Sequence, residues 1–433
     1  MHIYLLLLST LLTAAASSGS TEKIGPSRED IESHLSSKTP YRVIANRNDK
    51  EVKYPGCTPI RIWSVIRHGT RNPSRKFIEC AQTHLHRLRD KIVNSTKSHL
   101  SEQQKVALQK WTLTISPDEE KILLVEGEDE LLELAERMQN RFPDLLVENY
   151  DPLHYKFKYT ATQRTLKSAE SFATGLFGRQ HIRQITYPPA LHKDPILRFY
   201  KLCNRWKSEV DKNPDSLVEV KKFEQSSEMK KALKQIMKKT GLSGLTPTDA
   251  HQMYMACAFE TAWSKNQMSP WCAVFDKHSI RTMEYYKELE HYYIDGYGHE
   301  LTTKIACPAV VDMLDHISPT SVHTNATFYF THSGTILKLL AHLQLYKDDF
   351  VLTHNDFNRN RKWRISKIDA FASNIAFVTF DCGSEAKVLV LHQERVVHLP
   401  GCPPDQHLCS YEQIRHILKD SVERCEFNEI CKL

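Results

Sequence analysis

The stretch RIWSVIRHGTRNP, residues 61–73, decides the fold class. Residues 61–66 are apolar, aromatic and β-branched over the length of a strand. The run ends abruptly in charged and polar residues, where Gly69 and Pro73 are typical of a loop. A strand is therefore predicted to carry a polar cluster at its end.

The same order of strand, turn and helix recurs along the chain. Periodicity predicts strands over 154–159 and 327–330, a turn over 331–335, and helices over 121–146, 161–176 and 336–345. Two further strand-like runs, 374–380 and 387–391, predict a hairpin near the end of the chain. Alternation of this kind predicts an α/β fold, with a mostly parallel central sheet flanked by helices.

The middle of the chain differs in character. Residues 195–299 contain helical patterns without strand-like runs, including an amphipathic stretch over 227–239 that Gly241 is suited to end. We therefore expect an α/β domain over 20–194 and 300–433, with a helical insert domain over 195–299. Residues up to about Lys53 are polar and without a clear period, which predicts an extended segment before the folded body.

Composition excludes several classes of protein. The chain has 433 residues, of which 41% are hydrophobic and 25% charged, as in ordinary globular domains and unlike disordered or coiled-coil chains. Its net charge of +6 is a mild excess spread over the whole length. Nucleic-acid binding is therefore not expected, whereas a small anionic substrate suits the charge. Nothing in the sequence predicts an oligomeric state.

The N-terminal residues 1–19 have the pattern of a secretory signal peptide. Their apolar run is shorter than the roughly 20 residues that a membrane span needs, so no stable membrane span is expected. Asn94 and Asn325 begin N-glycosylation sequons, and the C-terminus has no retrieval signal for the endoplasmic reticulum. These features predict a secreted protein, or one in the lumen of the secretory pathway.

Chemistry concentrates in the polar cluster after the first strand. His68 is a candidate nucleophile, and the forked donors of Arg67 and Arg71 match phosphate oxygens. Gly69 is expected to let the backbone approach the phosphate closely. The alternative is an incidental loop with a structural histidine and two solvated arginines. The sequence has no HExxH, P-loop or GxSxG motif, so zinc and nucleotide chemistry are unsupported.

The cluster resembles the signature of the histidine acid phosphatases, and its continuation TRNPS, residues 70–74, is similar to the multiple inositol polyphosphate phosphatase branch. The resemblance extends over nearly the whole mature chain, through TQRT at 162–165, SPWC at 269–272 and GYG at 296–298. It implies hydrolysis of inositol polyphosphates such as phytate, with 2,3-bisphosphoglycerate as a second substrate. It implies no cofactor or metal.

The resemblance also implies roles for individual residues. His68 attacks phosphorus and forms a phosphohistidine, while Arg67, Arg71, Arg164 and His332 hold the phosphate oxygens. Phosphoryl transfer depends mainly on positioning and on cations around the equatorial oxygens, so these roles agree with the chemistry of the side chains. His332 follows a predicted strand and precedes a predicted helix, whose N-terminal N–H groups suit a phosphate.

The chain departs from this branch at its second motif. The branch usually has His-Ala-Glu there, and the carboxyl protonates the leaving alcohol, whereas this chain has His332-Ser333-Gly334. General-acid help is worth about 10²–10⁴ in rate, so its loss leaves three outcomes: a slow enzyme, another proton donor, or a phosphate binder. A broad-specificity acid phosphatase and a weakly catalytic inositol-phosphate-binding protein therefore remain as alternatives.

The eleven cysteines favour disulfides in an oxidising compartment, and their odd number leaves at least one unpaired. Short spacing favours Cys402 with Cys409 and Cys425 with Cys431, although such pairs are also zinc ligands in cytosolic proteins. The resemblance suggests Cys257 with Cys272. We expect a long-range bridge from Cys57 to Cys382.

Overall fold

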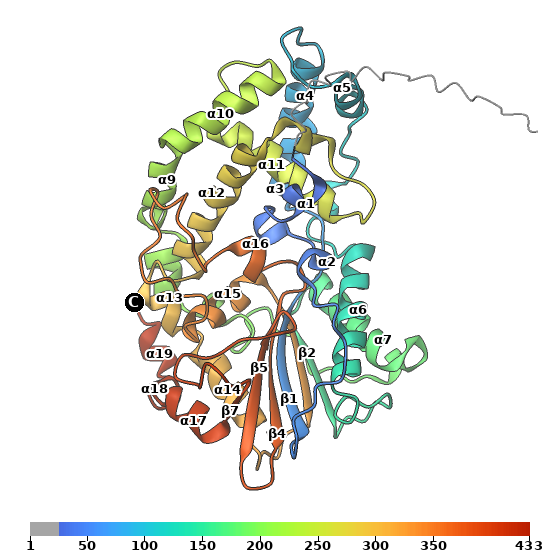
Figure 1. The fold of residues 1–433 in the computed structure, drawn as a ribbon, viewed down its shortest axis with the longest axis vertical. Helices are drawn as coiled ribbons and strands as arrows, with labels where there is room; N and C mark the ends of the chain where they lie inside the picture. The colour runs from blue at the N-terminus through green and yellow to red at the C-terminus, as the bar shows by residue number, and fades with distance from the viewer. Residues whose placement is uncertain (1–25) are drawn as a thin grey trace, which may run out of the picture.

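The computed structural model describes residues 26–433, so the predicted signal peptide over 1–19 lies outside the described residues (Figure 1). One mixed sheet organises the fold, with strand order β2-β3-β1-β4-β5-β6 and β7 beside β5. The strands are β1 (Thr58–Arg67), β2 (Tyr155–Tyr159), β3 (Ala326–Thr331), β4 (Asn374–Asp381), β5 (Ala386–His392), β6 (Arg395–Val396) and β7 (Leu408–Ser410).

The predicted α/β fold is confirmed, and its parallel strands form the part of the sheet that carries the polar cluster. β2, β3 and β1 are parallel neighbours, whereas β4 to β7 pair in antiparallel fashion. The predicted hairpin over 374–380 and 387–391 is confirmed as β4 and β5, which are joined by a short turn. A short turn can only join antiparallel strands, and this is why the sheet is mixed.

Helices cover both faces of the sheet (Figure 1). On one face, Ile62 and Ile66 of β1 pack with α6 (Val125–Arg141) and α7 (Gln163–Phe177). On the other face, Trp63 and Val65 pack with α14 (Cys307–Ile317) and α15 (Ser333–His342). Side chains alternate between the faces of a strand, so one apolar strand supplies both cores.

A helical part lies beyond the carboxyl ends of the parallel strands, at the top of Figure 1. Two sequence segments build it: the helices within 195–299, and the helices that directly follow the polar cluster. One apolar core connects it with the sheet. The division into domains at 194 and 299 stays a prediction. These helices are α3 (Arg75–Cys80), α4 (His86–Val93), α5 (Glu102–Gln109), α8 (Asn204–Trp206), α9 (Val218–Glu224), α10 (Ser227–Thr240), α11 (Pro247–Ala262) and α12 (Lys277–Asp295).

Short helices complete the chain. After α12 come α13 (Glu300–Lys304) and, just before β4, α16 (Ile365–Ile368). The C-terminal tail forms α17 (Tyr411–Ile417), α18 (Lys419–Glu423) and α19 (Phe427–Ile430). Of the helices in the described range 26–433, none is both long and apolar enough to cross a membrane.

The expectation of an extended segment before Tyr54 is wrong for residues 26–44, whereas residues 45–53 form neither helix nor strand. Residues 26–44 form α1 (Arg28–Glu32), a 3₁₀ turn over Ser36–Lys38 and α2 (Tyr41–Ile44), and Ile31 and Leu35 are fully buried. Helices of one turn are too short to show a hydrophobic period, which is why the sequence did not predict them.

Five disulfides bind the fold together. The pairs Cys57–Cys382, Cys257–Cys272 and Cys402–Cys409 confirm the expectation. The pair Cys425–Cys431 is wrong: Cys425 bonds to Cys307 of α14, and Cys431 bonds to Cys203 before α8. The tail lies against the body of the fold, so each tail thiol meets a distant partner. Cys80 is unpaired.

Candidate functional site

The parallel register of β1 and β3 sets two histidines side by side. Arg67 ends β1 and pairs with Thr331, which ends β3. The His68 N–H donates to the Thr331 carbonyl oxygen at 3.0 Å. The rings of His68 and His332 are both buried, with centroids 5.7 Å apart. Open α/β sheets bind ligands at this edge, beyond the carboxyl ends of parallel strands.

The third parallel strand adds a guanidinium. β2 pairs with β3, and α7 begins three residues beyond the end of β2, so Arg164 lies in its first turn. Arg164 Nη2 lies 3.1 Å from His332 Nδ1. Together with Arg67 and Arg71, whose charges act on both histidines, the predicted site residues therefore form one cluster.

Hydrogen bonding fixes which nitrogen of His68 is free. Its Nδ1 lies 2.9 Å from the Gly69 carbonyl oxygen, which only accepts, so Nδ1 carries the proton and Nε2 carries the lone pair. Burial holds the pKa of His68 well below its usual range, and the nearby charges of Arg164, Arg71 and Arg67 add to this. The ring is therefore a neutral nucleophile even in acid.

His332 is held as the opposite tautomer. Arg164 donates to its Nδ1, so its Nε2–H donates to Thr160 Oγ1 at 2.9 Å. Burial, followed by the charges of Arg164 and Arg198, holds the pKa of His332 well below its usual range. In this arrangement His332 is a neutral donor that is oriented by both neighbours.

Arg67 is fixed from two sides. Its Nη1 donates to the Asp369 carbonyl oxygen at 2.6 Å, its Nη2 donates to the Ser37 carbonyl oxygen at 2.8 Å, and its guanidinium lies 4.8 Å from the centroid of the Phe371 ring. The Ser37 contact comes from the N-terminal segment, which the sequence did not predict to reach the site. It is part of the wall that orients Arg67.

The guanidiniums crowd one another, and buried donors remain among them. Burial and the neighbouring charges lower the pKa of Arg71 to about 9 and that of Arg164 to about 10, so both stay cations at neutral pH. The Nε–H groups of Arg67, Arg71 and Arg164 are buried and have no partner among the described residues. Unpaired buried donors next to a neutral imidazole suit an oxyanion.

Two further cations border the cluster, and sequence reasoning missed both. Arg198 acts on the pKa of Arg164 and of His332, and its Nε–H is also buried without a partner among residues 26–433. Lys38 lies at the other side, where burial and the charges of Arg71 and Arg67 hold its pKa well below the usual range. Neither residue belongs to a motif, and only the fold brings them to the site.

In the structure, Gly69 allows a close contact between the loop and helix α6; the sequence had suggested a close contact with phosphate. A Cβ on Gly69 would lie 2.3 Å from the Gly127 carbonyl oxygen, so the residue lets the loop pack on the first turn of α6. Glu130, one turn further along α6, accepts from Thr70 N–H at 2.7 Å and from Thr70 Oγ1 at 3.0 Å. Helix α6 thereby fixes the loop that carries His68.

The turn after His332 holds no carboxyl of its own. Ser333 and Gly334 open α15, and both are half-buried. A Cβ on Gly334 would make only ordinary contacts, at 3.4 Å from Asp295 Oδ1 and 3.5 Å from Tyr200 Cζ. A Cβ therefore fits at position 334 without a clash.

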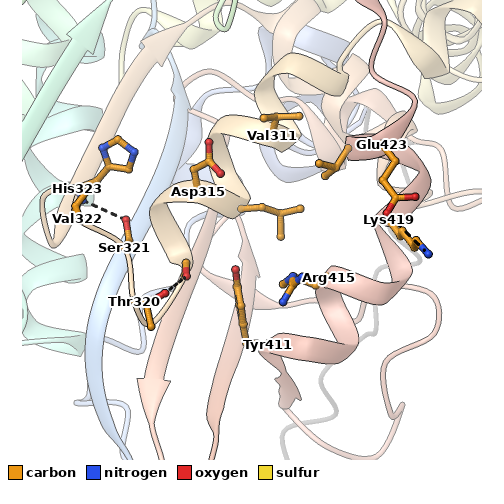
Figure 2. A pocket seen from close by; sticks show the side chains of 13 residues that line it. Val311, Asp315, Thr320, Ser321, Val322, His323, Tyr411, Arg415, Lys419 and Glu423 are labelled. Atoms are coloured by element: carbon orange, nitrogen blue, oxygen red, sulfur yellow. Dashed lines mark hydrogen bonds and ion pairs between the residues drawn. The ribbon is translucent and has the colours of Figure 1, made fainter.

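A pocket of about 420 Å³ lies elsewhere, between α14, the loop before β3, and helices α17 and α18 (Figure 2). Asp315, His323, Tyr411 and Arg415 are among its lining residues. His323 lies just before β3 begins, whereas His332 follows its end. The pocket is therefore at the opposite end of the strand from the histidine pair.

Comparisons with known proteins agree with this geometry. A family model of the histidine phosphatase superfamily (branch 2) matches residues 61–399. Multiple inositol polyphosphate phosphatase 1 of Drosophila melanogaster is 35% identical over 399 residues, which cover 88% of this chain and 83% of that protein.

Solved structures show the same fold. The phytase from D. castellii superposes with a TM-score of 0.75 at 14% identity, over 93% of this chain and 87% of the phytase. The multiple inositol polyphosphate phosphatase of Bifidobacterium longum, solved in complex with inositol hexasulfate, has a TM-score of 0.68 at 18% identity, over 88% of this chain and 96% of that one. The arrangement of strands and helices is shared with both.

Proposed function

Because this chain belongs to the histidine phosphatase superfamily (branch 2), we propose that it hydrolyses inositol polyphosphates through a phosphohistidine on His68. Members of this superfamily are phosphomonoester hydrolases, and this chain is one of them. The observation that carries the proposal is the buried, neutral His68 ring, whose free Nε2 faces a cluster of guanidiniums.

The proposed reaction has two steps. The lone pair of His68 Nε2 forms a bond to phosphorus while the ester P–O bond breaks, and the electron pair of that bond leaves with the alcohol oxygen. Arg67, Arg71 and Arg164 hold the phosphoryl oxygens, and His332 joins them when its Nε2–H exchanges Thr160 Oγ1 for a phosphoryl oxygen. Water then attacks phosphorus, and the P–N bond breaks to return His68 and free phosphate. Fixed cations around the equatorial oxygens suit the charge of this transition state.

The number of cations supports a polyphosphorylated substrate. Three guanidiniums and His332 are enough for a single phosphate, yet the Arg198 guanidinium adds charge at the border of the same cluster, and the Lys38 amine borders it as well. The other phosphates of an inositol ring, with one phosphate bound at His68, would contact these two side chains. The names of the multiple inositol polyphosphate phosphatase relatives support the same substrate class. By the same chemistry, 2,3-bisphosphoglycerate is proposed as a second, smaller substrate.

A secretory location is part of the proposal. Five disulfides form and persist in an oxidising compartment. The N-terminal pattern of a signal peptide supports export into such a compartment.

The test is phosphate release from inositol hexakisphosphate across pH by the wild type and by His68→Ala. Wild-type turnover and its loss in His68→Ala are expected, together with an acid-labile, alkali-stable phosphoenzyme in rapid-quench experiments on the wild type. His398→Ala, which removes an exposed histidine after β6, is the matched control and should behave as wild type. Phosphate release by His68→Ala would overturn the phosphohistidine.

The absent Glu at position 334 favours one second candidate, a binding protein built on a phosphatase site. Tight binding of inositol hexakisphosphate without phosphate release would identify it. Turnover that appears only in Gly334→Glu would do the same, because this substitution restores the carboxyl that the branch usually has there. Similar rates of phosphate release from inositol hexakisphosphate and from unrelated phosphomonoesters would identify a broad-specificity acid phosphatase instead.

A further inference from the structure

A buried carboxyl reaches the second motif from another part of the chain. Asp369 lies between α16 and β4, and its side chain is fully buried. Ser333 Oγ donates to Asp369 Oδ2. Ser333 directly follows His332 and is half-buried. The bond to Asp369 therefore connects that carboxyl with the residue next to His332. The motif that lacks an acid in sequence is therefore bonded to one in space.

The loop that carries Asp369 is anchored to the nucleophile. The Ala372 N–H donates to the His68 carbonyl oxygen at 3.1 Å, and the Arg67 N–H donates to the Ser373 carbonyl oxygen at 2.8 Å. Arg67 Nη1 also lies 3.4 Å from Asp369 Oδ2. These contacts hold the carboxyl at a fixed place relative to the ring that attacks phosphorus.

The surroundings of Asp369 favour a neutral acid. Its Oδ1 is buried and has no partner among residues 26–433, a costly arrangement for an anion. Burial raises the pKa of Asp369, and the charge of Asp295 adds to the rise, whereas Arg67, the hydrogen bond from Ser333 and the charge of His291 oppose it. Lys38, on the N-terminal segment, also lies close enough to Asp369 for the two charges to interact.

The other carboxyl near the second motif cannot supply a proton. Asp295 of α12 bonds to the buried ammonium of Lys338, and His291 Nδ1 lies 2.8 Å from its Oδ2. Although burial opposes it, the Lys338 charge holds the pKa of Asp295 well below its usual range. Asp295 is therefore an ion, and of these two carboxyls Asp369 is the one whose pKa is raised.

We propose that Ser333 and Asp369 form the proton relay that replaces the missing acid of the second motif. In the reacting state Asp369 is protonated, so its Oδ2–H donates to Ser333 Oγ, the reverse of the bond to the carboxylate, and the Ser333 hydroxyl turns to the leaving oxygen. As the P–O bond breaks, Ser333 gives its proton to that oxygen and takes the proton of Asp369 Oδ2. The resulting carboxylate is stabilised by Arg67. In the second step the attacking water gives its proton back through Ser333 to Asp369. Ser333 is the group that touches the substrate, and Asp369 acts through it. The relay rests on the proposed phosphatase function.

A proton donor matters in proportion to how poor the leaving group is. The alcohol of an inositol phosphate needs a proton in order to leave, whereas p-nitrophenolate leaves as an anion. Loss of general-acid help is therefore expected to cost about 10²-fold or more in kcat on inositol hexakisphosphate, and much less on p-nitrophenyl phosphate. A merely structural residue would lower both rates alike.

The experiment measures both rates for Ser333→Ala, Asp369→Asn and the double variant of the full chain. Each single variant should lower the ratio of the two rates by about 10²-fold, and the double variant should lower it no further, because the two residues act in series. Asp369→Asn should also lose the basic limb of the pH profile on the inositol substrate. Ser373→Ala, which removes a buried hydroxyl bonded to Ile368 in the same loop, is the matched control and should leave the ratio unchanged.

Two more variants guard against misfolding. Ser333→Thr keeps the hydroxyl and should keep the ratio, and Gly334→Glu in the Ser333→Ala background should restore it. An unchanged ratio in folded Ser333→Ala or Asp369→Asn would overturn the relay. Failure of the phosphohistidine would be distinct, because it would appear as activity on both substrates in His68→Ala.

Discussion

Replacement of Gly127 by Ala tests whether helix α6 positions the catalytic loop. Gly127 lies in the first turn of α6, and a Cβ there would be 2.3 Å from the Thr70 carbonyl oxygen and 2.6 Å from the Thr70 nitrogen. Ordinary contacts begin near 3.4 Å. Since both sides are backbone, neither can rotate away, and the loop and the helix must separate by about 1 Å.

That separation reaches the nucleophile directly. Thr70 lies two residues after His68, and Glu130 of the same helix fixes its N–H and its hydroxyl. A misplacement of about 1 Å costs on the order of 10²-fold in rate, so we expect kcat of Gly127→Ala to fall by about that factor.

The assay is single-turnover phosphoryl transfer to the enzyme, with rates normalised to the folded fraction from thermal unfolding. Gly175→Ala is the control: its Cβ would lie 2.4 Å from the Leu132 carbonyl oxygen, a similar clash between α7 and α6. Gly175 lies eleven residues after Arg164 along α7, about 16 Å away, so this variant should lose stability but keep its rate. A wild-type rate of phosphoryl transfer in folded Gly127→Ala would refute the role of α6 in positioning the catalytic loop.

Further predictions concern charge, crosslinks and glycans. The acid limb of kcat/KM should lie below the ordinary histidine pKa of about 6.5, because the depressed pKa of His68 keeps its ring neutral as pH falls; a limb at or above 6.5 would contradict this. Removing the Cys57–Cys382 bridge by a double Ala substitution should lower the free energy of unfolding by about 6 kcal/mol in urea titrations, the chain-entropy value for a bridge that spans 325 residues. In a secretory host, Asn94→Gln should remove a glycan and shift electrophoretic mobility, because Asn94 is exposed. Asn325→Gln should shift it less, because the Asn325 amide is half-buried and donates to a backbone carbonyl; equal shifts would count against the difference.

The parts of the site that sequence predicts are those that regular elements place. The apolar strand over 61–66 has a clear pattern, and the turn after 327–330 follows from the change to helical period. Parallel strands bring their carboxyl ends together, so His68 and His332 meet for reasons that are visible in the sequence. Arg164 follows from the same rule, because it begins the helix after β2.

The parts that sequence missed depend on packing between distant segments. Ser37 and Lys38 belong to a single helical turn without a period, and Arg198 lies in an irregular segment. Asp369 stands outside every motif, and only the folded chain connects it with the site, through Arg67 and Ser333. Spacing alone also gave the wrong partner for Cys425, because short spacing in the sequence does not show which part of the fold the tail packs against.

The crosslinked tail makes the fold depend on thiols that lie far apart in the sequence. Cys425 and Cys431 lie after α17, whereas their partners are Cys307 of α14 and Cys203 before α8. During synthesis these two partners stay unpaired until residues 425 and 431 have been made. A chain truncated before residue 425 would keep both of them, as well as Cys80, as free thiols. The number of free thiols therefore reports whether the tail is attached: one when both bridges are closed, and five when both are open.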